Sequence, residues 1–347
     1  MNFERRAPVS VIVVNHNRRE LLRGCLESLA RQSAGGFTVV VVDNGSTDGS
    51  AEMAEREFGA APFRLKVVRN RENRGFCAAN NQGIAASEEP FIALLNNDAE
   101  AAPGWLEALL GAFEDPGVGM AASKILTWEE PPRIDKAGHL IYLDGQNRGR
   151  GTGEPDRGQY DRREEVLWPD GCAAMYRRRM LEEIGGFDED FFAYGDDAEL
   201  GLRARIAGWR CLYVPEAVVR HRRASTLGPA SARRVELIER NRVLLAAKLF
   251  PWSLLWLNGA YYAARIGAGL LAAAANRGEA SRFPGPGGKI RLAVAMVKGD
   301  LAALRLLPRM LRKRREVNRI RRLSPAEVRA LLMRHRIPLR ELTFQAG

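Results

Sequence analysis

The chain has 347 residues, of which 46% are apolar and 27% charged, so it can form a sizeable core and is neither a disordered nor a fibrous protein. The net charge of +11 is unevenly distributed. Residues 1–221 carry 27 Lys/Arg and 35 Asp/Glu, whereas residues 222–347 carry 26 and 7. A basic tail of this kind favours an anionic partner, either nucleic acid or an acidic membrane face.

The chain contains four cysteines, none of them in the CxxC spacing of zinc sites: Cys25, Cys77, Cys172 and Cys211. All four lie in apolar or helical contexts. We therefore expect reduced core thiols and no disulfide framework.

The first apolar run, residues 9–14, is short and β-branched, and Asn15, His16 and Asn17 follow it at once. It predicts a strand and not the hydrophobic segment of a signal peptide. We expect the folded body to stay in the cytoplasm.

Short β-branched runs alternate with helical stretches over the N-terminal third. The runs of strand length are 9–14, 37–42, 65–68, 91–95 and 118–122. Apolar residues recur at helical spacing over 18–31, 48–58, 76–86 and 103–113. This alternation predicts right-handed crossovers and a mostly parallel, doubly wound α/β sheet. Ligands bind such sheets at the carboxyl ends of the strands, so the residues after each strand are the candidates for chemistry.

The middle of the chain combines an irregular stretch with a second α/β segment. Residues 127–170 are rich in Gly, Pro and charge, which predicts long loops or a hairpin that stay mobile until substrate binds. The elements expected after it are strands at 172–177 and 210–214, the second ended by Pro215, and helices at 178–184 and 197–207.

Beyond His221 the sequence predicts helices of a different character. A helix at 231–249 has basic and apolar faces, and the segment 249–275 carries Arg265 as its single charge, with two Trp and two Tyr near its start. This segment fits an interfacial helix or hairpin in the headgroup region, a membrane span, or a buried helix of a soluble domain. An amphipathic stretch at 290–307 leads into a strongly basic run, which favours phospholipid attraction over a merely solvated face.

Asp43 is the first polar residue after four valines at the end of the second predicted strand. A carboxylate there can accept a hydrogen bond from a base N–H, while residues 44–46 form the strand-to-helix turn. A turn or a helix N-cap is the alternative role.

Two polar clusters follow the third and fourth runs. Asn73 and Asn80 flank a glycine turn that opens a helix, a setting that suits a ribose or a diphosphate. The sequence FIALLNNDAE delivers Asn97 and Asp98 at the end of a strand, where oxygen ligands suit Mg²⁺ or Mn²⁺. Helix caps and a β-turn are the alternatives.

The segment GGFDEDFFAYGDDAEL crowds Asp196, Asp197 and Glu199 at the start of a helix, beside aromatic residues that include Tyr194. Acidic residues favour helix N-termini in any protein. Carboxylates this close also raise one another's pKa, as a group that must accept a proton requires. His221 follows a later apolar run, where a structural role is the alternative to a ligand.

The order and spacing of these motifs resemble the family 2 glycosyltransferases of GT-A fold, above all the rhamnosyltransferase-like branch of bacterial cell-surface polysaccharide synthesis. The resemblance covers about residues 8–250 and is carried by Asp43, Asn73-Gly75-Asn80, Asp98, GGFDE with Asp196-Asp197, and His221. It implies a GT-A catalytic domain over 1–230 and a helical C-terminal region over 231–347 that makes a membrane-surface or oligomer contact.

The resemblance also implies a donor site. Asp43 would bind the uracil or thymine edge of a nucleoside-diphosphate sugar. Further pocket residues would be Asn15, Asn73, Gly75, Asn80 and Asn97. Asp98 and His221 would hold Mg²⁺ or Mn²⁺ at the diphosphate, although the acidic-x-acidic motif of the family stands here as Asn-Asn-Asp, with one carboxylate.

Asp197 would be the catalytic base, supported by Asp196, with acceptor contacts from Glu199, Tyr194 and Cys172. A departing diphosphate needs its developing charge neutralised, and an attacking hydroxyl needs a base. One base and one metal on opposite faces of the sugar predict single displacement with inversion.

The expected function is therefore inverting, metal-dependent transfer from a UDP- or dTDP-sugar, dTDP-rhamnose included, to a glycan or polyprenyl-linked saccharide of the cell envelope. The basic tail fits an enzyme held peripherally at the inner face of the cell membrane, an anionic surface. We expect no nucleic-acid partner, and the C-terminal helices suit an oligomer equally well.

Three other hypotheses for the function are alternatives to a glycosyltransferase. A dehydrogenase would show GxGxxG after the first strand, where VNHNRREL stands, and a sugar-phosphate nucleotidyltransferase would need a Gly-rich, basic loop there. A catalytically inactive α/β nucleotide-binding adaptor, whose basic tail binds a membrane or nucleic acid, is the alternative from another class.

Overall fold

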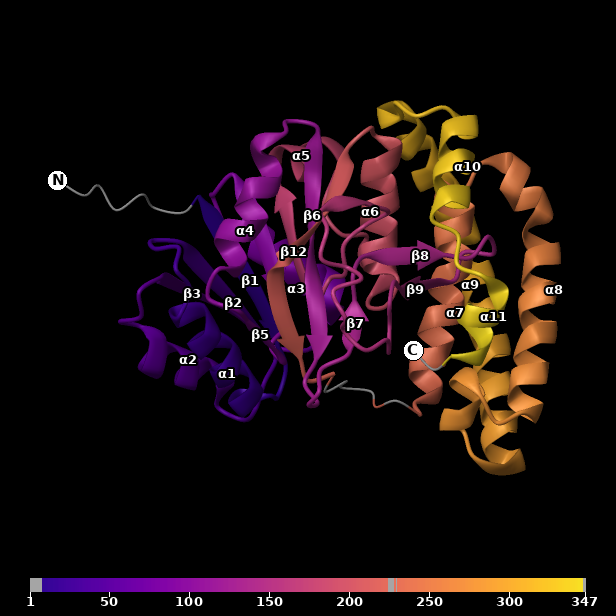
Figure 1. Ribbon diagram of the computed structural model, residues 1–347, viewed down its shortest axis with the longest axis horizontal. Coiled ribbons are helices and arrows are strands. Elements are labelled where there is room, and N and C mark those ends of the chain that lie inside the picture. Colours follow the sequence, from indigo (N-terminus) through magenta and orange to yellow (C-terminus); the bar gives the residue numbers. More distant parts are fainter. Residues whose placement is uncertain (1–7, 224–227, 229, 346–347) are drawn as a thin grey trace. The chain divides into compact units, whose positions relative to one another are not determined.

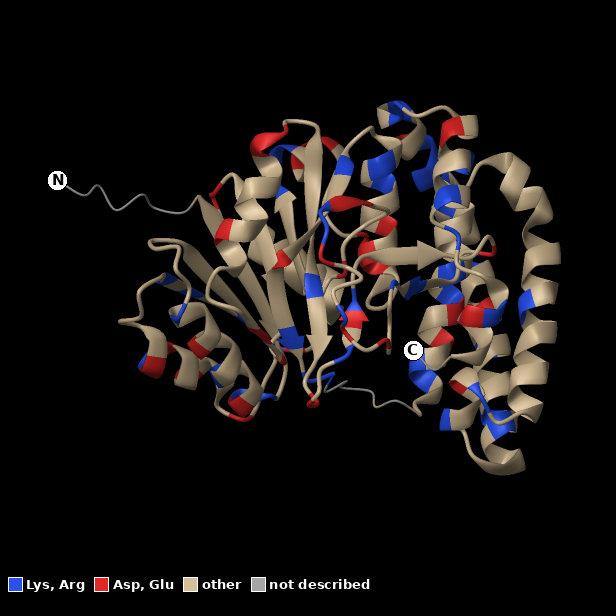
Figure 2. Cartoon of the chain, viewed as in Figure 1, with Lys and Arg blue, Asp and Glu red and all other residues tan. Residues whose placement is uncertain are grey.

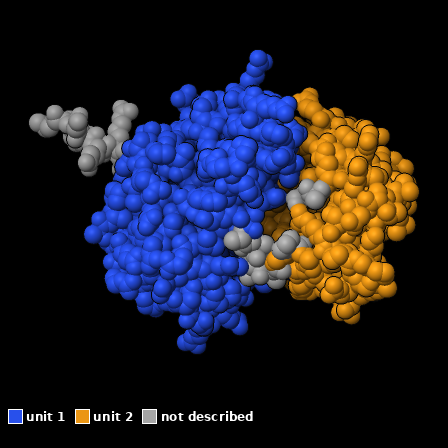
Figure 3. Space-filling view, turned by 60° about the horizontal axis from the view of Figure 1, so that its bottom comes forward, with its two compact units in different colours: residues 1–138, 151–193, 209–223 blue, residues 139–150, 194–208, 224–347 orange. Residues whose placement is uncertain are grey.

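The computed structural model describes residues 8–223, 228 and 230–345. Residues in mutual contact form two compact units, each assembled from separate stretches of the chain (Figure 3). The first comprises residues 1–138, 151–193 and 209–223, and the second comprises 139–150, 194–208 and 224–347. The domain boundary at residue 230 stays a prediction.

Four parallel strands form one half of the sheet in the first unit (Figure 1). In sheet order they are β3 (Arg64–Asn70), β2 (Thr38–Asn44), β1 (Val9–Asn15) and β4 (Phe91–Leu95). The helices between them are α1 (Arg19–Ala30), α2 (Ser50–Phe58) and α3 (Gly75–Ala85). The predicted alternation of strands and helices is confirmed here. The strand order reverses at β1, which places the expected ligand crevice at the carboxyl ends of β1 and β4.

The other half of the sheet is mixed. Its strands are β5 (Ala99–Ala101), β6 (Val118–Thr127), β7 (Ile134–Lys136), β10 (Glu164–Val166), β11 (Ala173–Arg177) and β12 (Arg210–His221). β6 and β12 are parallel, but β11 runs antiparallel between β4 and β6. The prediction of a mostly parallel sheet therefore holds for the first half only, because no helical crossover sets the direction of β11. The helices of this half are α4 (Trp105–Gly111), η1 (Ala112–Glu114), α5 (Arg178–Ile184) and η2 (Glu189–Phe191).

The core of the first unit follows from the apolar periodicity of its elements. The alternate valines of β1 and β2 are fully buried because these central strands are covered on both faces. Helix α1 contributes Leu22, Cys25, Leu26 and Leu29, spaced three or four residues apart on one face. All four cysteines of the chain are buried and free, as predicted.

The strand β12 corrects the prediction that Pro215 ends it. The strand continues to His221, and its pairing with β6 is interrupted by a register shift between Val214 and Val218. Proline lacks the N–H that a regular ladder needs, and an irregularity of this kind removes that need. The extension matters because it carries His221 to the edge of the sheet.

The second unit consists of the hairpin β8 (His139–Ile141) and β9 (Asn147–Gly149), the helix α6 (Asp196–Ile206) and the C-terminal helices (Figure 1). These helices are α7 (Ala232–Leu249), α8 (Trp252–Ala274), η3 (Gly278–Arg282), α9 (Gly285–Ile320), α10 (Pro325–Arg334) and α11 (Leu339–Phe344). The hairpin expected within residues 127–170 is thus present, and the mobility of that stretch stays a prediction.

Helix α9 packs closely on α7. Its inward side is lined by small residues, since Ala295, Gly299 and Ala303 are buried. A Cβ atom on Gly299 would lie 2.5 Å from the carbonyl oxygen of Glu236. Because glycine has no side chain, the two helix backbones can approach closely at this point.

Helix α8 turns its single charge inward. Arg265 donates to Asp144 at 2.5 Å and to the two oxygens of Glu239 at 2.9 and 2.7 Å. Arg242 also donates to Glu239, at 3.0 Å, and to Asp300, at 2.8 Å. This network ties α8 to α7 and to the turn of the hairpin. In the part of the chain that the structure describes, no helix has the length and hydropathy needed to cross a membrane.

Candidate active site

Polar residues end the strands on both sides of the reversal point of the sheet. Asn15 ends β1 and lies in register with Asp43 of β2. Asn97, which follows β4, donates from Nδ2 to Oδ1 of Asn15 at 2.6 Å. Three predicted donor-site residues thus meet at the carboxyl edge of β1, β2 and β4.

Asp43 is a buried carboxylate whose two oxygens have different surroundings in the described part of the chain. The residue is 5% exposed, and its Oδ2 accepts a hydrogen bond from the backbone N–H of Ser46 at 3.3 Å. Its Oδ1 is buried and has no hydrogen-bond partner among the described residues. Native proteins rarely leave a buried polar atom unsatisfied, so a ligand N–H is the natural complement.

Asn44 holds the next predicted segment in place. Its Nδ2 donates to Oδ1 of Asn73 at 3.0 Å and to the carbonyl of Gly75 at 3.3 Å, and its Oδ1 accepts from the backbone of Arg74 at 3.0 Å. Asn44 is 2% exposed. The sequence predicts only a turn at Asn44, because nothing in the local pattern reveals a contact with a loop from the following crossover.

Gly75 lies against Phe192. The glycine has φ +84°, and a Cβ atom there would lie 2.5 Å from the Phe192 ring. The Phe192 carbonyl accepts hydrogen bonds from the N–H groups of Phe76, at 2.8 Å, and Cys77, at 3.3 Å. The structure therefore joins the RENRGF and GGFDEDFF motifs at the N-terminus of α3. Phe192 itself has φ +62°, a strained conformation of the kind that gathers at functional sites.

Asn80 is buried in α3. Its Nδ2 donates to the carbonyl of Phe76 at 2.9 Å, within the same helix. The side chain of the neighbouring Asn81 bonds to both backbone groups of Phe187. Nδ2 donates to the Phe187 carbonyl at 2.9 Å, and Oδ1 accepts from the Phe187 N–H at 2.8 Å. Asn81 thus fixes the GGFDE turn on α3, and the donor contact of Asn80 stays a prediction.

Asp98 and His221, the two predicted metal ligands, are adjacent. Oδ1 of Asp98 lies 3.2 Å from Nε2 of His221, and the side chains are 9% and 11% exposed. The antiparallel pairing of β5 with β12, which sets Ala99 opposite His221, brings them together. The carbonyl of Asp98 also accepts a hydrogen bond from the backbone of Arg222 at 2.9 Å.

Asp135 contacts the same imidazole, although no sequence pattern identified it as a site residue. Its Oδ2 lies 2.7 Å from Nδ1 of His221, and its side chain is fully buried. Burial alone would raise the pKa of Asp135, but the His221 hydrogen bond and the nearby Lys136 and Arg223 hold the pKa below its ordinary value. Asp135 comes from the irregular stretch 127–170, where no periodicity or spacing marks a functional carboxylate.

The surroundings of His221 favour positive charge. Burial alone would lower the pKa of the imidazole, but Cys172, Asp135 and Asp98 raise the pKa well above its ordinary value. Burial raises the pKa of the Cys172 thiol, and His221 offsets part of the rise. Cys172 also accepts, through its carbonyl, a hydrogen bond from the backbone of Asn96 at 2.8 Å. The predicted acceptor residue Cys172 thus lies beside the predicted metal ligands.

The predicted base and its neighbours belong to the second unit. Asp197 is in the first turn of α6, with its side chain 13% exposed and Oδ2 3.5 Å from Nε2 of His139. Asp196 is 6% exposed. Tyr194 has φ +68°, and its carbonyl accepts from Asn241 Nδ2 at 2.5 Å. The helix start thus presents Asp197 next to an imidazole.

Glu199 occupies an internal position in the second unit. Its side chain is fully buried and ion-paired with Arg203, at 2.8 Å, and with Lys248 of α7, at 2.6 Å. These contacts anchor α6 to α7. Its acceptor contact stays a prediction.

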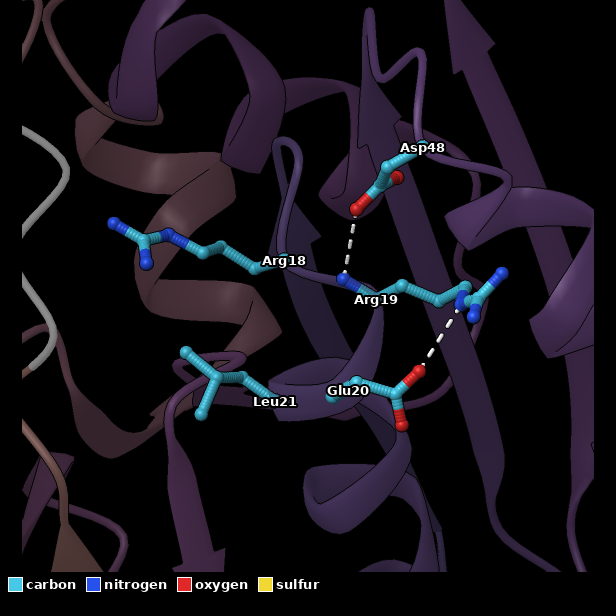
Figure 4. A pocket seen from close by; sticks show the side chains of 5 residues that line it. All are labelled: Arg18, Arg19, Glu20, Leu21 and Asp48. Atoms are coloured by element: carbon cyan, nitrogen blue, oxygen red, sulfur yellow. Dashed lines mark hydrogen bonds and ion pairs between the residues drawn. The ribbon is translucent and has the colours of Figure 1, made fainter.

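A hollow beside the start of α1 contains none of the predicted site residues (Figure 4). It is lined by Arg18, Arg19, Glu20, Leu21 and Asp48. Asp48 accepts from the backbone of Arg19 at 2.9 Å and from the backbone of Ser50 at 3.1 Å. Burial raises the pKa of Asp48, but these hydrogen bonds and that of the Ser50 hydroxyl lower it overall. Both carboxylate oxygens of Asp48 therefore have partners within the protein, whereas Oδ1 of Asp43 has none among the described residues.

The order of the strands and the polar edge at β1 and β4 define the GT-A fold of glycosyltransferases. The mannosyltransferase PcManGT of Pyrobaculum calidifontis, solved in complex with GDP-Man and Mn²⁺, matches 86% of this chain and 87% of its own at a TM-score of 0.53 and 20% identity. Residues 1–349 of TarS from S. aureus match 94% of this chain and 90% of that chain, at a TM-score of 0.51 and 16% sequence identity. At these identities the likeness shows the fold alone.

The chain belongs to glycosyl transferase family 2, whose model matches residues 10–185. The pre-mycofactocin glycosyltransferase of Mycobacterium tuberculosis is 31% identical over 216 residues, which are 61% of this chain and 42% of that protein. The N-acetylglucosaminyl-diphospho-decaprenol L-rhamnosyltransferase of the same species is 28% identical over 249 residues, 64% of this chain and 78% of that protein. An uncharacterized protein of Sinorhizobium fredii is 29% identical over 230 residues, only 25% of its length.

Proposed function

We propose that this protein is an inverting, metal-dependent glycosyltransferase that moves a sugar from a nucleoside-diphosphate donor to a hydroxyl of a glycan or lipid-linked saccharide. The observation that carries the proposal is the adjacency of Asp98 and His221 at the carboxyl edge of a GT-A sheet. Membership of glycosyl transferase family 2 supports it.

The geometry of Asp98 and His221 suits a shared cation. Asp98 and His221 would hold the cation together, since Oδ1 and Nε2 lie 3.2 Å apart at this edge of the sheet. Binding would require His221 to give up the ring proton that its raised pKa favours, and the cation would take the place of that positive charge beside Asp98. Asp135, bonded to the other ring nitrogen, is the support that ligating histidines usually have. When bound, Mg²⁺ or Mn²⁺ would neutralise charge on the leaving diphosphate.

The nucleobase of the sugar donor is proposed to bind Asp43. The unpartnered Oδ1 of this buried carboxylate would accept the imide N–H of uracil or thymine. Other donor contacts are assigned to residues of the same sheet edge and of α3, namely Asn15, Asn73, Gly75, Asn80 and Asn97. Asn44 positions the 73–75 loop through its hydrogen bonds.

The acceptor hydroxyl is proposed to lose its proton to Asp197. The hydroxyl oxygen bonds to the anomeric carbon from one face while the bond from that carbon to the diphosphate oxygen breaks on the other, so the configuration inverts. The imidazole of His139 lies beside the proposed base, with its Nε2 3.5 Å from Oδ2 of Asp197. Asp196 is assigned to support Asp197, and acceptor contacts are assigned to Tyr194, Glu199 and Cys172.

The donor proposed is a UDP- or dTDP-sugar, with dTDP-rhamnose included, for polysaccharide synthesis at the cell envelope. The name of the mycobacterial rhamnosyltransferase, which describes a decaprenol-linked acceptor, motivates a lipid-linked acceptor here. An acceptor of that kind would place the enzyme peripherally at the inner face of the cell membrane. A contact between copies of the chain is the other use proposed for the C-terminal helices.

The deciding experiment measures release of nucleoside diphosphate from a panel of UDP-, dTDP- and GDP-sugars with Mg²⁺, Mn²⁺ or EDTA. We expect metal-dependent release from one donor class and an inverted anomeric centre in the product by NMR. Asp98→Ala should abolish release, whereas Asp115→Ala, which removes an exposed carboxylate paired with Arg210, should preserve it. A retained configuration would contradict the proposed mechanism. No release, together with no thermal stabilisation by any donor and metal, would support the inactive adaptor instead.

A further inference from the structure

Helices α8 and α9 expose most of the large apolar side chains on the described surface. Thirteen such side chains are exposed among the described residues, and eleven lie on these two helices. On α8 they are Trp252, Trp256, Leu257, Leu270 and Leu271, and on α9 they are Ile290, Val294, Val297, Leu301, Leu304 and Leu311. Soluble surfaces rarely gather apolar side chains in this way unless they bind something.

On α9 the usual distribution of side chains is inverted. The face packed on α7 is built from small residues such as Ala295, Gly299 and Ala303. The large side chains recur at alternating spacings of four and three residues on the opposite face from Ile290 to Leu304, Leu311 follows seven residues later, and all are 44–63% exposed. A stripe at this spacing forms one continuous line along a helix. The line therefore needs a partner outside the second unit.

A row of cations accompanies this stripe. Each lies one position after a residue of the stripe or continues its seven-residue repeat, and all are exposed: Arg291, Lys298, Arg305, Arg312 and Arg319. The whole helix holds ten Lys/Arg and two acidic residues. One of the two, Asp300, is already bonded to Arg242 and Tyr262. An apolar line flanked by cations matches a surface that is apolar beneath anionic groups.

Helix α8 adds a long surface without charge. Its single charged residue, Arg265, is buried in ion pairs with Asp144 and Glu239. In Figure 2 the helix is tan along nearly all of its length. Trp256 is 86% exposed near its start, and indole rings favour the interface between lipid headgroups and acyl chains.

We propose that the outward faces of α8 and α9 dock on the surface of an anionic lipid bilayer, with the apolar stripe among the acyl chains and the cation row at the phosphates. This inference rests on the proposed function in one respect, because a lipid-linked acceptor would be found there. A second copy of the chain fits less well, because pairing two α9 stripes would bring two cation rows together with few acids to oppose them. Nucleic acid would match the cations and leave the apolar stripe exposed.

The test is co-sedimentation of the full chain with vesicles of phosphatidylcholine and phosphatidylglycerol, compared with phosphatidylcholine alone, at low and high salt. We expect binding to the anionic vesicles that salt weakens. Replacing Arg291, Lys298 and Arg305 by Gln should lower the affinity about a hundredfold. The matched control replaces three exposed cations of the first unit by Gln and should bind as the unaltered chain does: Arg157, Arg162 and Arg179.

A second variant, Val297→Ser with Leu301→Ser, tests the apolar stripe at exposed positions that leave the α7 contact intact. We expect weaker vesicle binding, unchanged circular dichroism and unchanged nucleoside-diphosphate release with a lipid-free acceptor. Equal binding of both variants and the unaltered chain would overturn the proposal. So would a dimer, detected by light scattering, that the Val297/Leu301 variant disrupts, or tight binding of duplex DNA in place of vesicles. Vesicle binding is measured without donor, so its failure is distinct from failure of the transferase assay.

Discussion

Nε2 of His221 lies 3.2 Å from Oδ1 of Asp98, while Nδ1 of the same ring lies 2.7 Å from Oδ2 of Asp135. One imidazole therefore connects two carboxylates of the first unit that are distant in sequence, one in the turn after β4 and the other in strand β7. Asp98 is the nearly buried partner that a metal would share, and Asp135 is the fully buried partner that fixes the ring.

Replacing Asp135 by Asn should weaken the metal site without removing a ligand. The change keeps the volume of the side chain but removes the charge that orients His221, so Mn²⁺ affinity should fall about 10- to 100-fold. Electron paramagnetic resonance of free Mn²⁺ measures this directly. Asp156→Asn, which alters a carboxylate paired with Lys124, is the control and should keep the affinity. Unchanged Mn²⁺ affinity in Asp135→Asn would show that Asp135 does not support metal binding.

Asp43→Asn should reduce donor affinity, because the buried Oδ1 would no longer carry charge for the base N–H. A hydrogen bond to a charged group contributes about 1.5–3 kcal/mol, so calorimetry should show UDP or dTDP binding weakened at least about tenfold. Asp48→Asn is the matched control, since the hydrogen bonds of Asp48 are made within the protein. That variant should lose some stability and keep its affinity. If Asp48→Asn lost affinity for the nucleotide and Asp43→Asn kept it, the nucleobase would instead bind in the hollow near α1.

Asp197→Asn should slow transfer and spare donor binding. A positioned general base contributes about 10²- to 10⁴-fold to the rate, so kcat should fall within that range while the Kd for the donor is unchanged. Single-turnover kinetics with the identified acceptor measures the chemical step. Glu189→Gln, on η2, is the control and should keep the rate. A drop in donor affinity equal to the drop in kcat would point to a structural role for Asp197.

Gly75→Ala should lower the free energy of unfolding by more than the backbone cost of placing alanine at a positive φ. The added Cβ would meet the Phe192 ring, whereas Gly153, at φ +85°, has no atom within 4 Å of such a Cβ. Gly153→Ala should lower the free energy of unfolding by about 1 kcal/mol, the backbone cost. Gly75→Ala should lower it further and weaken donor binding, because Phe192 must move. Chemical denaturation and calorimetry of the two variants measure the loss of unfolding free energy and of donor affinity. Equal losses in the two variants would show that the contact with Phe192 contributes nothing.

Arg265→Met should destabilise the second unit strongly, because it leaves Asp144 and Glu239 buried beside fewer cations. Breaking a buried ion pair by removing one partner costs about 3–5 kcal/mol. Thermal and urea unfolding measure the loss, and Arg277→Met, at an exposed position, should have little effect. A small change in Arg265→Met would show that the network is solvated.

The same network predicts how stability depends on pH. Burial alone would raise the pKa of Glu239, but Arg265 and Arg242 hold the pKa below its ordinary value of 4.5. A carboxylate with a depressed folded-state pKa stabilises the fold above its unfolded pKa, and the contribution is lost as pH falls through the folded value. Stability should therefore decline below pH 4.5. The decline should be smaller in Arg265→Met, and an equal decline would exclude Glu239 as its source.

Local structure and the chemistry of single positions could be predicted from the order of the amino acids. Valine runs and helical apolar spacing predicted the main strands and helices of the first 122 residues, since each depends on contacts between near neighbours, but not the short strand β5. Asp43, Asp98 and His221 were identifiable because each lies within three residues after the end of an apolar run. The boundary of β12 was misplaced because Pro215 ends a regular ladder but not one that carries a register shift.

Which residues share a site depends on the packing of segments that are distant in sequence. Asp135 reaches His221 from an irregular stretch, and Asn44 holds the 73–75 loop from a neighbouring strand, so neither contact has a signature in local spacing. The pairing of β5 with β12 brings Asp98 to His221. The role of Arg265 was likewise decided by a hairpin turn and a helix distant in sequence, which supply its two carboxylates. Periodicity reports what a segment buries, whereas the identity of its partners depends on how separate segments pack.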